Sequence, residues 1–558
     1  MRHTITPARS HLFSWIGIAV PVVLVTLAVW NSVPSFDGAM NLQVAQSIAE
    51  GDGFQRYYSE GTLFPDEIQT SGYFMLFQAL VIRLLGPDTA VFQFANLAFI
   101  ALLAIGTSLA VRRWPVARLI APSLVIFALP GGSGSRTLTL GVGGYGEFAV
   151  AALAIVACVA MARAFEADVR RPHLMIALAS IAAGVAITIK IVAVLIVPVL
   201  AVGLVLGLIA RRPRAPGRAI LTAASGIVPI VIFEAYRLIS LGSWRAYADH
   251  WGNEAYATAM QAGVTGENVY ASDPAAHQGR TVFGKIAEHW LELSHATGID
   301  WFTLIVIVLA PFAILTLVAY RHRATWREWC VGGQGLLATQ LALYAGGYLV
   351  WWLAITPTEK AWYRRIVIAV VCVIVLYVVV TCLAMEEMKA SSRPIRRLRT
   401  PALMIGAATA CAVAVAGSAV ASSLTGSVVE AVRSMPWSAT ASNHIREQAV
   451  REAAATVDRL SSEGDTVYGM GWWSAPVVQL YAQGKIDNLL AKDDITCLPD
   501  LVEGRGHLVW DSYALRLADL YATAPDSIAF AAEPPFAADY ARFYRILVPS
   551  DGCPAPVG

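Results

Sequence analysis

The sequence predicts an α-helical polytopic membrane protein that ends in a small α/β domain, and three observations support this fold class. The 558 residues are 57% hydrophobic and only 14% charged, and their mean hydropathy is +0.58. Apolar runs long enough to cross a bilayer are spread along the chain, and arginine-rich loops alternate with loops poor in basic residues. This composition excludes a water-soluble enzyme. The near balance of 41 basic and 39 acidic residues gives no reason to expect a nucleic-acid partner.

Eleven apolar runs predict transmembrane helices, because a bilayer crossing needs about 20 apolar residues. The first run is too long for the core of a signal peptide and lacks a small-residue cleavage site, so we expect it to remain as a helix. The predicted spans are residues 11–33, 90–111, 119–130, 146–163, 173–189, 191–210, 219–240, 301–320, 330–354, 366–385 and 401–423.

The loops between these runs fall into two groups by charge. Short arginine-rich loops alternate with longer loops poor in basic residues, which are 34–89, 131–145, 241–300, 355–365 and the tail after 424. Basic residues gather in cytoplasmic loops. The N-terminus is therefore predicted inside and the longer loops and the tail outside, and the expected location is a bacterial plasma membrane.

The tail differs in character from the rest of the chain, which predicts a membrane domain over 1–424 and a soluble extracytoplasmic domain over 425–558. Mixed charge and Pro-rich turns replace the long apolar runs. Short β-type runs lie at 466–470, 507–510 and 543–548, with helical stretches near 475–482 and 513–522. Alternation of this kind is typical of a small α/β domain.

The first external loop, 34–89, opens with an acid directly after the first span. Asp37 precedes a stretch in which polar residues from Gln43 to Glu50 share one helical face and apolar residues occupy the other. This pattern predicts an amphipathic helix in the membrane interface that ends at Gly51. An acid at the start of such a helix either caps it or does chemistry, and on local sequence alone capping is the commoner role.

The same loop carries a second acidic site. Asp66 and Glu67 precede the apolar stretch 73–85, which ends at Gly86 and lies too close to the next span to be a separate crossing. We expect it to be a second interface helix. Acids before a helix N-terminus are favourable electrostatically, so Glu67 is either a simple turn residue or a substrate contact.

Two isolated charges lie where spans meet the external face. Glu147, preceded by Tyr145 in a glycine-rich loop, enters at the outer end of the fourth span. Lys190 is the one ionisable residue in the apolar stretch 174–210, between the fifth and sixth spans. A lone ammonium there either extends to the surface along its alkyl chain or binds an anion such as a phosphate.

Further charged residues mark two other outer positions. Glu234 and Arg237 are three residues apart at the end of the seventh span, and their spacing predicts a pair on one helical face. Arg364 and Arg365 lie in an external loop and break the rule that places basic residues inside. That departure makes them candidates for binding an anion.

The cysteine and histidine residues give only weak evidence for a disulfide or a metal site. Cys497 and Cys553 lie in the tail, where they either form a disulfide in an oxidising compartment or stay as free thiols. His289, Glu292 and His295 share a helical face, but no motif typical of a metal site accompanies them. No metal site is therefore assigned.

Taken together, these positions resemble the GT-C superfamily of membrane glycosyltransferases, which use polyprenyl-phosphate sugars. The resemblance includes Asp37 after the first span, Glu147 at the mouth of the fourth, and 186–190 between spans five and six. The stretch 66–70 is similar to a Glu-Gly-x-Thr element of the bacterial arabinofuranosyltransferases, with Ile68 replacing the glycine. The protein mannosyltransferases that use dolichyl-phosphate mannose are a second similar branch.

The resemblance implies a function and a role for each candidate residue. The donor would be a polyprenyl-phosphate sugar and the acceptor an envelope glycan or glycolipid. No cofactor would be required, and the resemblance leaves the use of a divalent metal ion undecided. Asp37 would be the general base. Lys190, Arg364 and Arg365 would bind the donor phosphate, and the substrate contacts would come from Glu67, Tyr145, Glu147, Glu234 and Arg237. A lipid-linked sugar flippase and a non-catalytic polyprenyl-glycan-binding protein are the alternatives.

Overall fold

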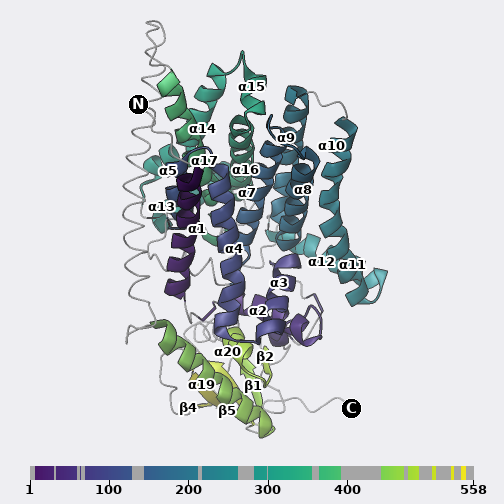
Figure 1. The fold of residues 1–558 in the computed structure, drawn as a ribbon. Helices are drawn as coiled ribbons and strands as arrows, with labels where there is room; N and C mark the ends of the chain where they lie inside the picture. The colour runs from purple at the N-terminus through teal and green to yellow at the C-terminus, as the bar shows by residue number, and fades with distance from the viewer. Residues whose placement is uncertain are drawn as a thin grey trace.

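The protein consists of a bundle of long helices with a smaller α/β unit against one end (Figure 1). The computed structural model describes residues 7–29, 33–34, 36–59, 63–64, 70–127, 144–211, 216–261, 282–297, 299–354, 363–390, 442–469, 475–488, 505–510, 529–532 and 542–547. Two short helices, α2 (Phe36–Glu50) and α3 (Gly72–Leu85), lie between the bundle and the unit. We call this end of the bundle the α2 end.

The bundle contains eight helices long and apolar enough to cross a membrane, counted over the described residues. The bundle helices are α1 (Pro7–Val29), α4 (Thr89–Ala110), α5 (Pro115–Phe127), α7 (Glu147–Ala164), α8 (Pro172–Ile189), α9 (Ile196–Arg211), α10 (Pro216–Ala223), α11 (Ile227–Leu241), α14 (Trp301–Arg321), α16 (Gln334–Ala354) and α17 (Tyr363–Ala390). The 3-10 turns η2 (Ile191–Leu195) and η3 (Ala224–Gly226) lead into α9 and α11. Helices α1 and α5 contain shorter apolar segments. Ten predicted spans thus coincide with helices, and the span at 401–423 lies outside the described residues.

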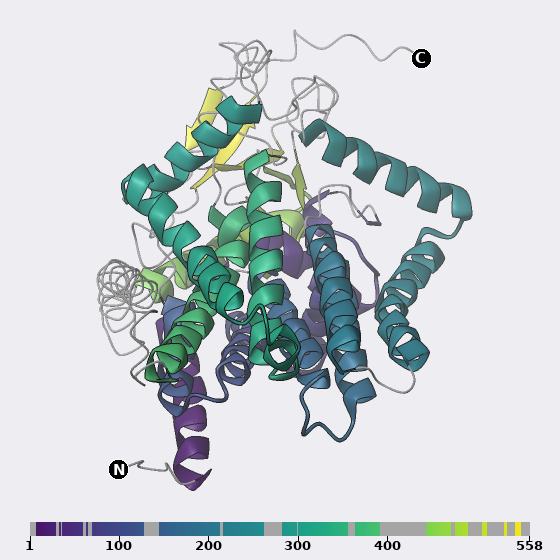
Figure 2. The same cartoon turned by 90° about the horizontal axis from the view of Figure 1, so that it is seen from above.

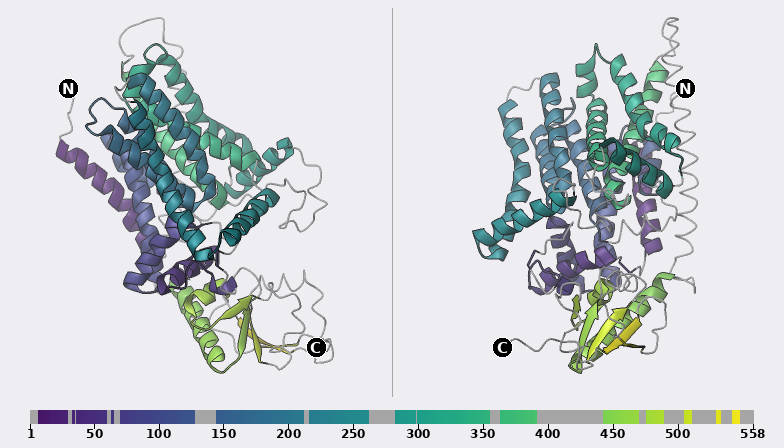
Figure 3. Two further views of the ribbon diagram at one scale, coloured as in Figure 1. Left: turned by 90° about the vertical axis from the view of Figure 1, so that its right-hand side faces the viewer. Right: turned by 180° about the vertical axis from the view of Figure 1, so that it is seen from behind.

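Three further helices connect bundle segments. They are α12 (Trp244–Gln261), α13 (Val282–Thr297) and α15 (Trp326–Val331). Figure 3 shows α12 and α13 toward the α2 end, in the segment between α11 and α14 that the sequence predicts to be external.

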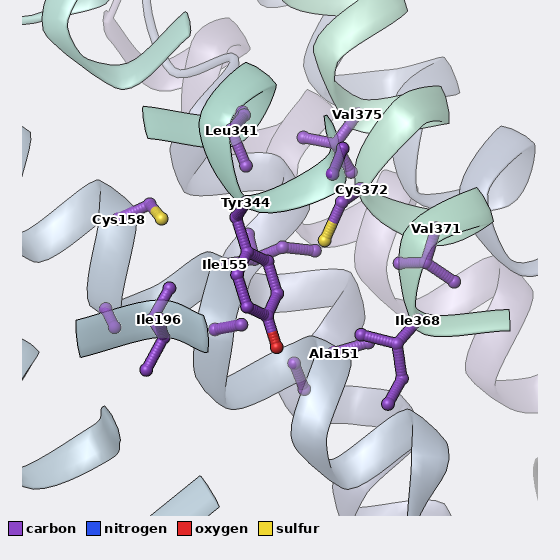
Figure 4. Packing of buried hydrophobic residues seen from close by; sticks show 14 of the residues in the cluster. Ala151, Ile155, Cys158, Ile196, Leu341, Tyr344, Ile368, Val371, Cys372 and Val375 are labelled. Atoms are coloured by element: carbon purple, nitrogen blue, oxygen red, sulfur yellow. The ribbon is translucent and has the colours of Figure 1, made fainter. Parts of the chain in front are cut away.

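Helix α7 forms the centre of the bundle. It packs against α4, α8, α9, α16 and α17, and most of its residues are buried. Many of them are alanines, and small residues allow neighbouring helices to approach closely in a membrane. Figure 2 views the helices along the bundle, and Figure 4 shows Tyr344 of α16 packed among Ile155 of α7, Ile196 of α9 and Cys372 of α17. The first residue of α7 is therefore held by a rigid core.

The arginine-rich loops meet at the end of the bundle opposite the α2 end. Glu166, which follows α7, accepts a hydrogen bond from Arg112 and lies 3.5 Å from Arg113, both of which follow α4. Arg211, at the end of α9, donates to the carbonyl oxygen of Glu166 at 2.8 Å. Loops that the sequence places on one side of the membrane by their charge thus share one end of the structure.

The two predicted interface helices are present as α2 and α3. Gly51 (φ +103°) follows α2 and Gly86 (φ +90°) follows α3, and both take the left-handed backbone that favours glycine at a helix end. The polar side of α2 is only partly exposed, however: Glu50 is exposed and Gln46 half-buried, whereas Gln43 and Ser47 are fully buried. Gln43 Nε2 donates to Pro476 O of the α/β unit at 2.6 Å, and Ser47 Oγ donates to Gly53 O, in the loop after α2, at 2.9 Å.

Within the described residues, the α/β unit is a five-stranded mixed sheet with two helices. The elements are α19 (Ser442–Ser462), β1 (Thr466–Gly469), α20 (Ala475–Tyr481), β2 (Ile486–Asn488), β3 (Gly506–Trp510), β4 (Ala529–Ala532) and β5 (Arg542–Leu547). The strand order is β2-β1-β3-β5-β4, with β1 parallel to β2 and β3, and β5 antiparallel to β3 and β4. The predicted β-type runs form β1, β3 and β5, and the stretch at 475–482 forms α20. The helical stretch at 513–522 lies outside the described residues.

The unit and the membrane part share an apolar core. Its buried members are Ala39, Leu42 and Ala45 of α2, Ala79 and Ile82 of α3, Phe92 of α4, Val450 of α19, and Val477 and Leu480 of α20. Polar contacts border this core: the hydroxyls of Thr89 and Tyr481 are 2.9 Å apart, and Arg451 pairs with Asp88 at 3.3 Å. The unit therefore fixes α2 in place by burying it on two sides.

Candidate functional site

Three helix ends that carry charged candidate residues converge at the α2 end of the bundle. Asp37 lies in the first turn of α2, Glu147 is the first residue of α7, and Lys190 follows the last residue of α8. The backbone of Gly144, just before α7, lies against Gly38, because a Cβ built on Gly144 would be 3.1 Å from Gly38 O. The segment that leads into Glu147 therefore contacts the turn of α2 that holds Asp37.

Glu147 and Lys190 form a buried ion pair. Lys190 Nζ is 2.9 Å from Glu147 Oε1, and the side chains are 12% and 4% exposed. Lys190 has an extended backbone (φ −144°, ψ +124°) between α8 and a 3-10 turn, which directs its side chain differently from a helical lysine. The sequence places both residues at one face of the membrane but does not predict their pairing.

The pair leaves part of its hydrogen-bonding capacity unused. Within the described part of the chain, Glu147 Oε2 is buried and has no hydrogen-bond partner. An ammonium has three donors, and among the residues that the structure describes Lys190 Nζ pairs with Glu147 alone. A buried acceptor without a donor costs free energy unless a ligand or water satisfies it. The geometry suits a bound molecule that offers a hydroxyl to Glu147 and an anionic oxygen to Lys190.

Asp37 is half-buried, and it is a residue of α2 itself and not the residue before the helix. The helix begins at Phe36, so the carboxyl belongs to the first turn, where the positive end of the helix dipole stabilises a negative charge. A carboxylate in this position can accept a proton from a nearby hydroxyl. The position thus fits the base role at least as well as the capping role.

The positive side of the site extends toward α17. Arg365 lies in the first turn of α17 and is half-buried, and Tyr348 of α16 lies within electrostatic range of both Arg365 and Glu147. Sequence analysis did not identify Tyr348; the available signal was its spacing of four residues from Tyr344, which aligns two aromatic hydroxyls on one face of α16. Arg364 belongs to the same helical turn, but its side chain is outside the described residues.

Glu234 and Arg237 form the predicted pair, inside a larger cluster. Arg237 Nη1 is 3.3 Å from Glu234 Oε2, which also accepts hydrogen bonds from Tyr247 at 2.9 Å and Trp251 at 3.1 Å of α12. Burial, followed by the hydrogen bond to Glu234, raises the pKa of Tyr247, so this phenol remains a proton donor at neutral pH. The carboxylate therefore holds α12 against the end of α11.

Arg237 lies among three aromatic rings. Its guanidinium carbon is 4.8 Å from the ring centre of Trp251, 5.2 Å from that of Phe233 and 5.4 Å from that of Phe64. Phe64 has a positive φ of +49° and stacks on Phe54 at 4.4 Å. Contacts of this kind fix the loop between α2 and α3 above the end of α11.

Replacing Arg237 with lysine should destabilise this cluster. A lysine keeps the charge but loses the flat face that lies over the rings, so we expect a loss of about 2 kcal/mol and a lower midpoint of thermal unfolding in detergent. The matched control is Arg245→Lys on α12, whose side chain is 93% exposed and should tolerate the change. Equal midpoints for the two variants would show that the stacking contributes nothing.

Several predicted positions are not described or serve other contacts. Glu67, Cys497 and Cys553 lie outside the described residues. The ring of His289 packs on Trp352 at 4.9 Å between centroids. Among the residues that the structure describes, no group of three His, Cys, Asp or Glu side chains is placed to bind a metal ion.

Comparison with solved structures identifies the fold. ArnT from Cupriavidus metallidurans bound to undecaprenyl phosphate is similar with a TM-score of 0.56 and 13% identity, over 99% of this chain and 100% of that one. ArnT in the apo state has a TM-score of 0.54 and 14% identity, over 96% and 98% of the two chains. The Archaeoglobus fulgidus oligosaccharyltransferase, in complex with zinc and sulfate, has a TM-score of 0.49 and 12% identity, over 98% and 74%.

Sequence comparison gives no closer assignment. No protein-family model and no curated protein matches the chain. The structural likeness to ArnT nevertheless covers the bundle, the two short helices of the α2 end and the α/β unit, since it extends over nearly the whole of both chains. This multi-pass membrane protein therefore has the fold of the GT-C membrane glycosyltransferases.

Proposed function

We propose that this protein is a glycosyltransferase that moves one sugar from a polyprenyl-phosphate donor to a cell-envelope glycan or glycolipid. The observation that carries the proposal is the buried Glu147–Lys190 pair, with an unused carboxylate oxygen, beside the turn of α2 that holds Asp37. The fold supports it, and so does the undecaprenyl phosphate bound to ArnT.

In this proposal the α2 end faces the outside of a bacterial plasma membrane. The meeting of the arginine-rich loops at the opposite end supports that orientation, because such loops stay in the cytoplasm. Residues 1–424 would form the catalytic membrane domain and residues 425–558 an extracytoplasmic domain. A lipid-linked donor and an envelope acceptor would then meet at the membrane surface.

The transfer follows from the charges at the site. Asp37 takes the proton of an acceptor hydroxyl while the hydroxyl oxygen attacks the anomeric carbon of the donor sugar. A new glycosidic bond forms as the bond from that carbon to the phosphate oxygen breaks, and the electron pair leaves with the polyprenyl phosphate. Lys190, with Arg365 and Arg364 from the start of α17, neutralises the charge of this leaving group.

The other candidates have supporting roles in this proposal. Glu147 accepts a hydrogen bond from a sugar hydroxyl through its free oxygen, and Glu67 and Tyr145 contact the sugars. Glu234 and Arg237 act from further away by holding α12 and the loop after α2 in place.

The test is transfer by the purified protein from a panel of polyprenyl-phosphate sugars carrying a radiolabel. We expect label to move to an acceptor lipid or glycan with at least one pentose or hexose donor, and a parallel reaction with chelator reports on a divalent ion. Binding of polyprenyl phosphate without turnover of any donor would contradict the proposal and favour a binding protein. Movement of intact donor across a vesicle membrane would favour a flippase.

A further inference from the structure

We infer, on the basis of the function proposed above, that Asn41 and Thr70 are positioning residues of the transfer reaction. Both hydrogen-bond the segment 144–146, which leads into Glu147. Through this segment they set the position of the Glu147–Lys190 pair relative to Asp37.

The segment 144–146 has an unusual backbone that needs external support. Gly144 and Gly146 have φ of +81° and +77°, so a left-handed residue stands on each side of Tyr145. A Cβ on Gly146 would lie 2.6 Å from Thr70 Cγ2, and one on Gly144 would lie 3.2 Å from Gly38 Cα. The segment is therefore packed tightly between α2 and the residues before α3.

Two buried side chains satisfy consecutive carbonyls of this segment. Asn41 Nδ2 donates to Gly144 O at 2.8 Å, and Thr70 Oγ1 donates to Tyr145 O at 2.6 Å. The two donor residues are 7% and 2% exposed. Buried carbonyls need partners, and here the partners come from other parts of the chain.

Thr70 and the adjacent Ser71 also connect this segment to the backbone before Lys190. The next residue, Ser71, donates its backbone N–H to Ile189 O at 3.0 Å and its hydroxyl to Thr188 O at 2.8 Å. Lys190 follows directly. The adjacent residues 70 and 71 thus hold the backbone before Glu147 and the backbone before Lys190 at a fixed separation.

Asn41 connects the same segment to the proposed base. It lies four residues after Asp37 in α2, so the two side chains leave the same face of the helix. Its amide holds Gly144, whose backbone also lies against Gly38, the residue that follows Asp37. Since a misplacement of about 1 Å can cost about 100-fold in rate, losing either hydrogen bond should impair catalysis without removing a group that touches substrate.

The experiment compares Thr70→Val, which removes the hydroxyl at nearly constant volume, with Thr70→Ser, which retains it. For Thr70→Val we expect kcat to fall about 30-fold with the donor KM within about 3-fold of wild type, and for Thr70→Ser we expect kcat within about 3-fold. Asn41→Leu should resemble Thr70→Val. Thr339→Val is the matched control, because its hydroxyl donates to Gly335 O within α16.

The possible outcomes separate this inference from the proposed function. Unchanged kcat in Thr70→Val, or equal losses in Thr70→Val and Thr70→Ser, would overturn the inference while leaving the proposed function intact. Wild-type protein that transfers no sugar from any donor would overturn both. If Thr70→Val does not fold, Asn41→Leu decides alone, with its thermal midpoint measured beside kcat: a loss of kcat at a wild-type midpoint supports positioning, and an unchanged kcat excludes it.

Discussion

We expect Asp37→Asn to lower the rate of sugar transfer by at least about 100-fold, because general-base catalysis contributes about 10²–10⁴ to such reactions. Asparagine has the shape of aspartate but cannot accept the proton of the acceptor hydroxyl. The fall should appear in kcat, with the donor KM nearly unchanged, since the proposed donor contacts are made by Lys190 and the arginines of α17. The measurement is initial-rate transfer of labelled sugar at saturating donor.

The matched control is Asp52→Asn, in the same loop. Asp52 is exposed beyond the end of α2 and accepts a hydrogen bond from Tyr57 at 3.0 Å. It should tolerate the substitution, because it lies at the far end of that helix from Asp37. Full activity of Asp37→Asn would remove the base assignment, whereas a loss confined to Asp52→Asn would place the base elsewhere in the loop.

Lys190→Met should impair both folding and catalysis. It leaves the buried Glu147 carboxylate without its counter-ion, and breaking a buried pair in this way costs about 3–5 kcal/mol. It also removes the charge that we propose faces the leaving phosphate, for which we expect a fall in kcat of at least about 100-fold. Thermal unfolding and labelled transfer measure the two effects separately.

The double variant Glu147→Gln, Lys190→Met separates a structural pair from a functional one. Both partners are then neutral, so most of the lost stability should return. Transfer should stay at least about 100-fold below wild type, because neither substitution restores a positive charge for the phosphate. Recovery of transfer together with stability would show that the pair only holds α7 and α8 together and would remove Lys190 from the donor site.

The acids, the lysine and the ten helices that coincide with predicted spans are visible in the sequence because they depend on local pattern. Apolar runs of bilayer length identify helices wherever they end up, and an isolated charge at the end of such a run needs a partner or contact with water. The two helices of the α2 end follow from periodicity and from Gly51 and Gly86. Arg237 pairs with Glu234 as predicted because a spacing of three residues brings them together on any α-helix.

The tertiary structure alone decided which of these residues meet. Asn41 and Gly144 are 103 residues apart in the chain, and Gln43 is buried by a unit whose contacting residue lies 433 positions away. The repeating pattern of apolar and polar residues along a helix or strand cannot predict contacts over such distances in the sequence. They follow from how α7 packs in the bundle and from the apolar core that the α/β unit shares with α2, which also explains why Gln43, on the polar face of α2, is buried. The sequence determined that charged groups stand at one membrane face, and packing determined that Glu147 pairs with Lys190 and that the segment before Glu147 contacts the turn of α2 that holds Asp37.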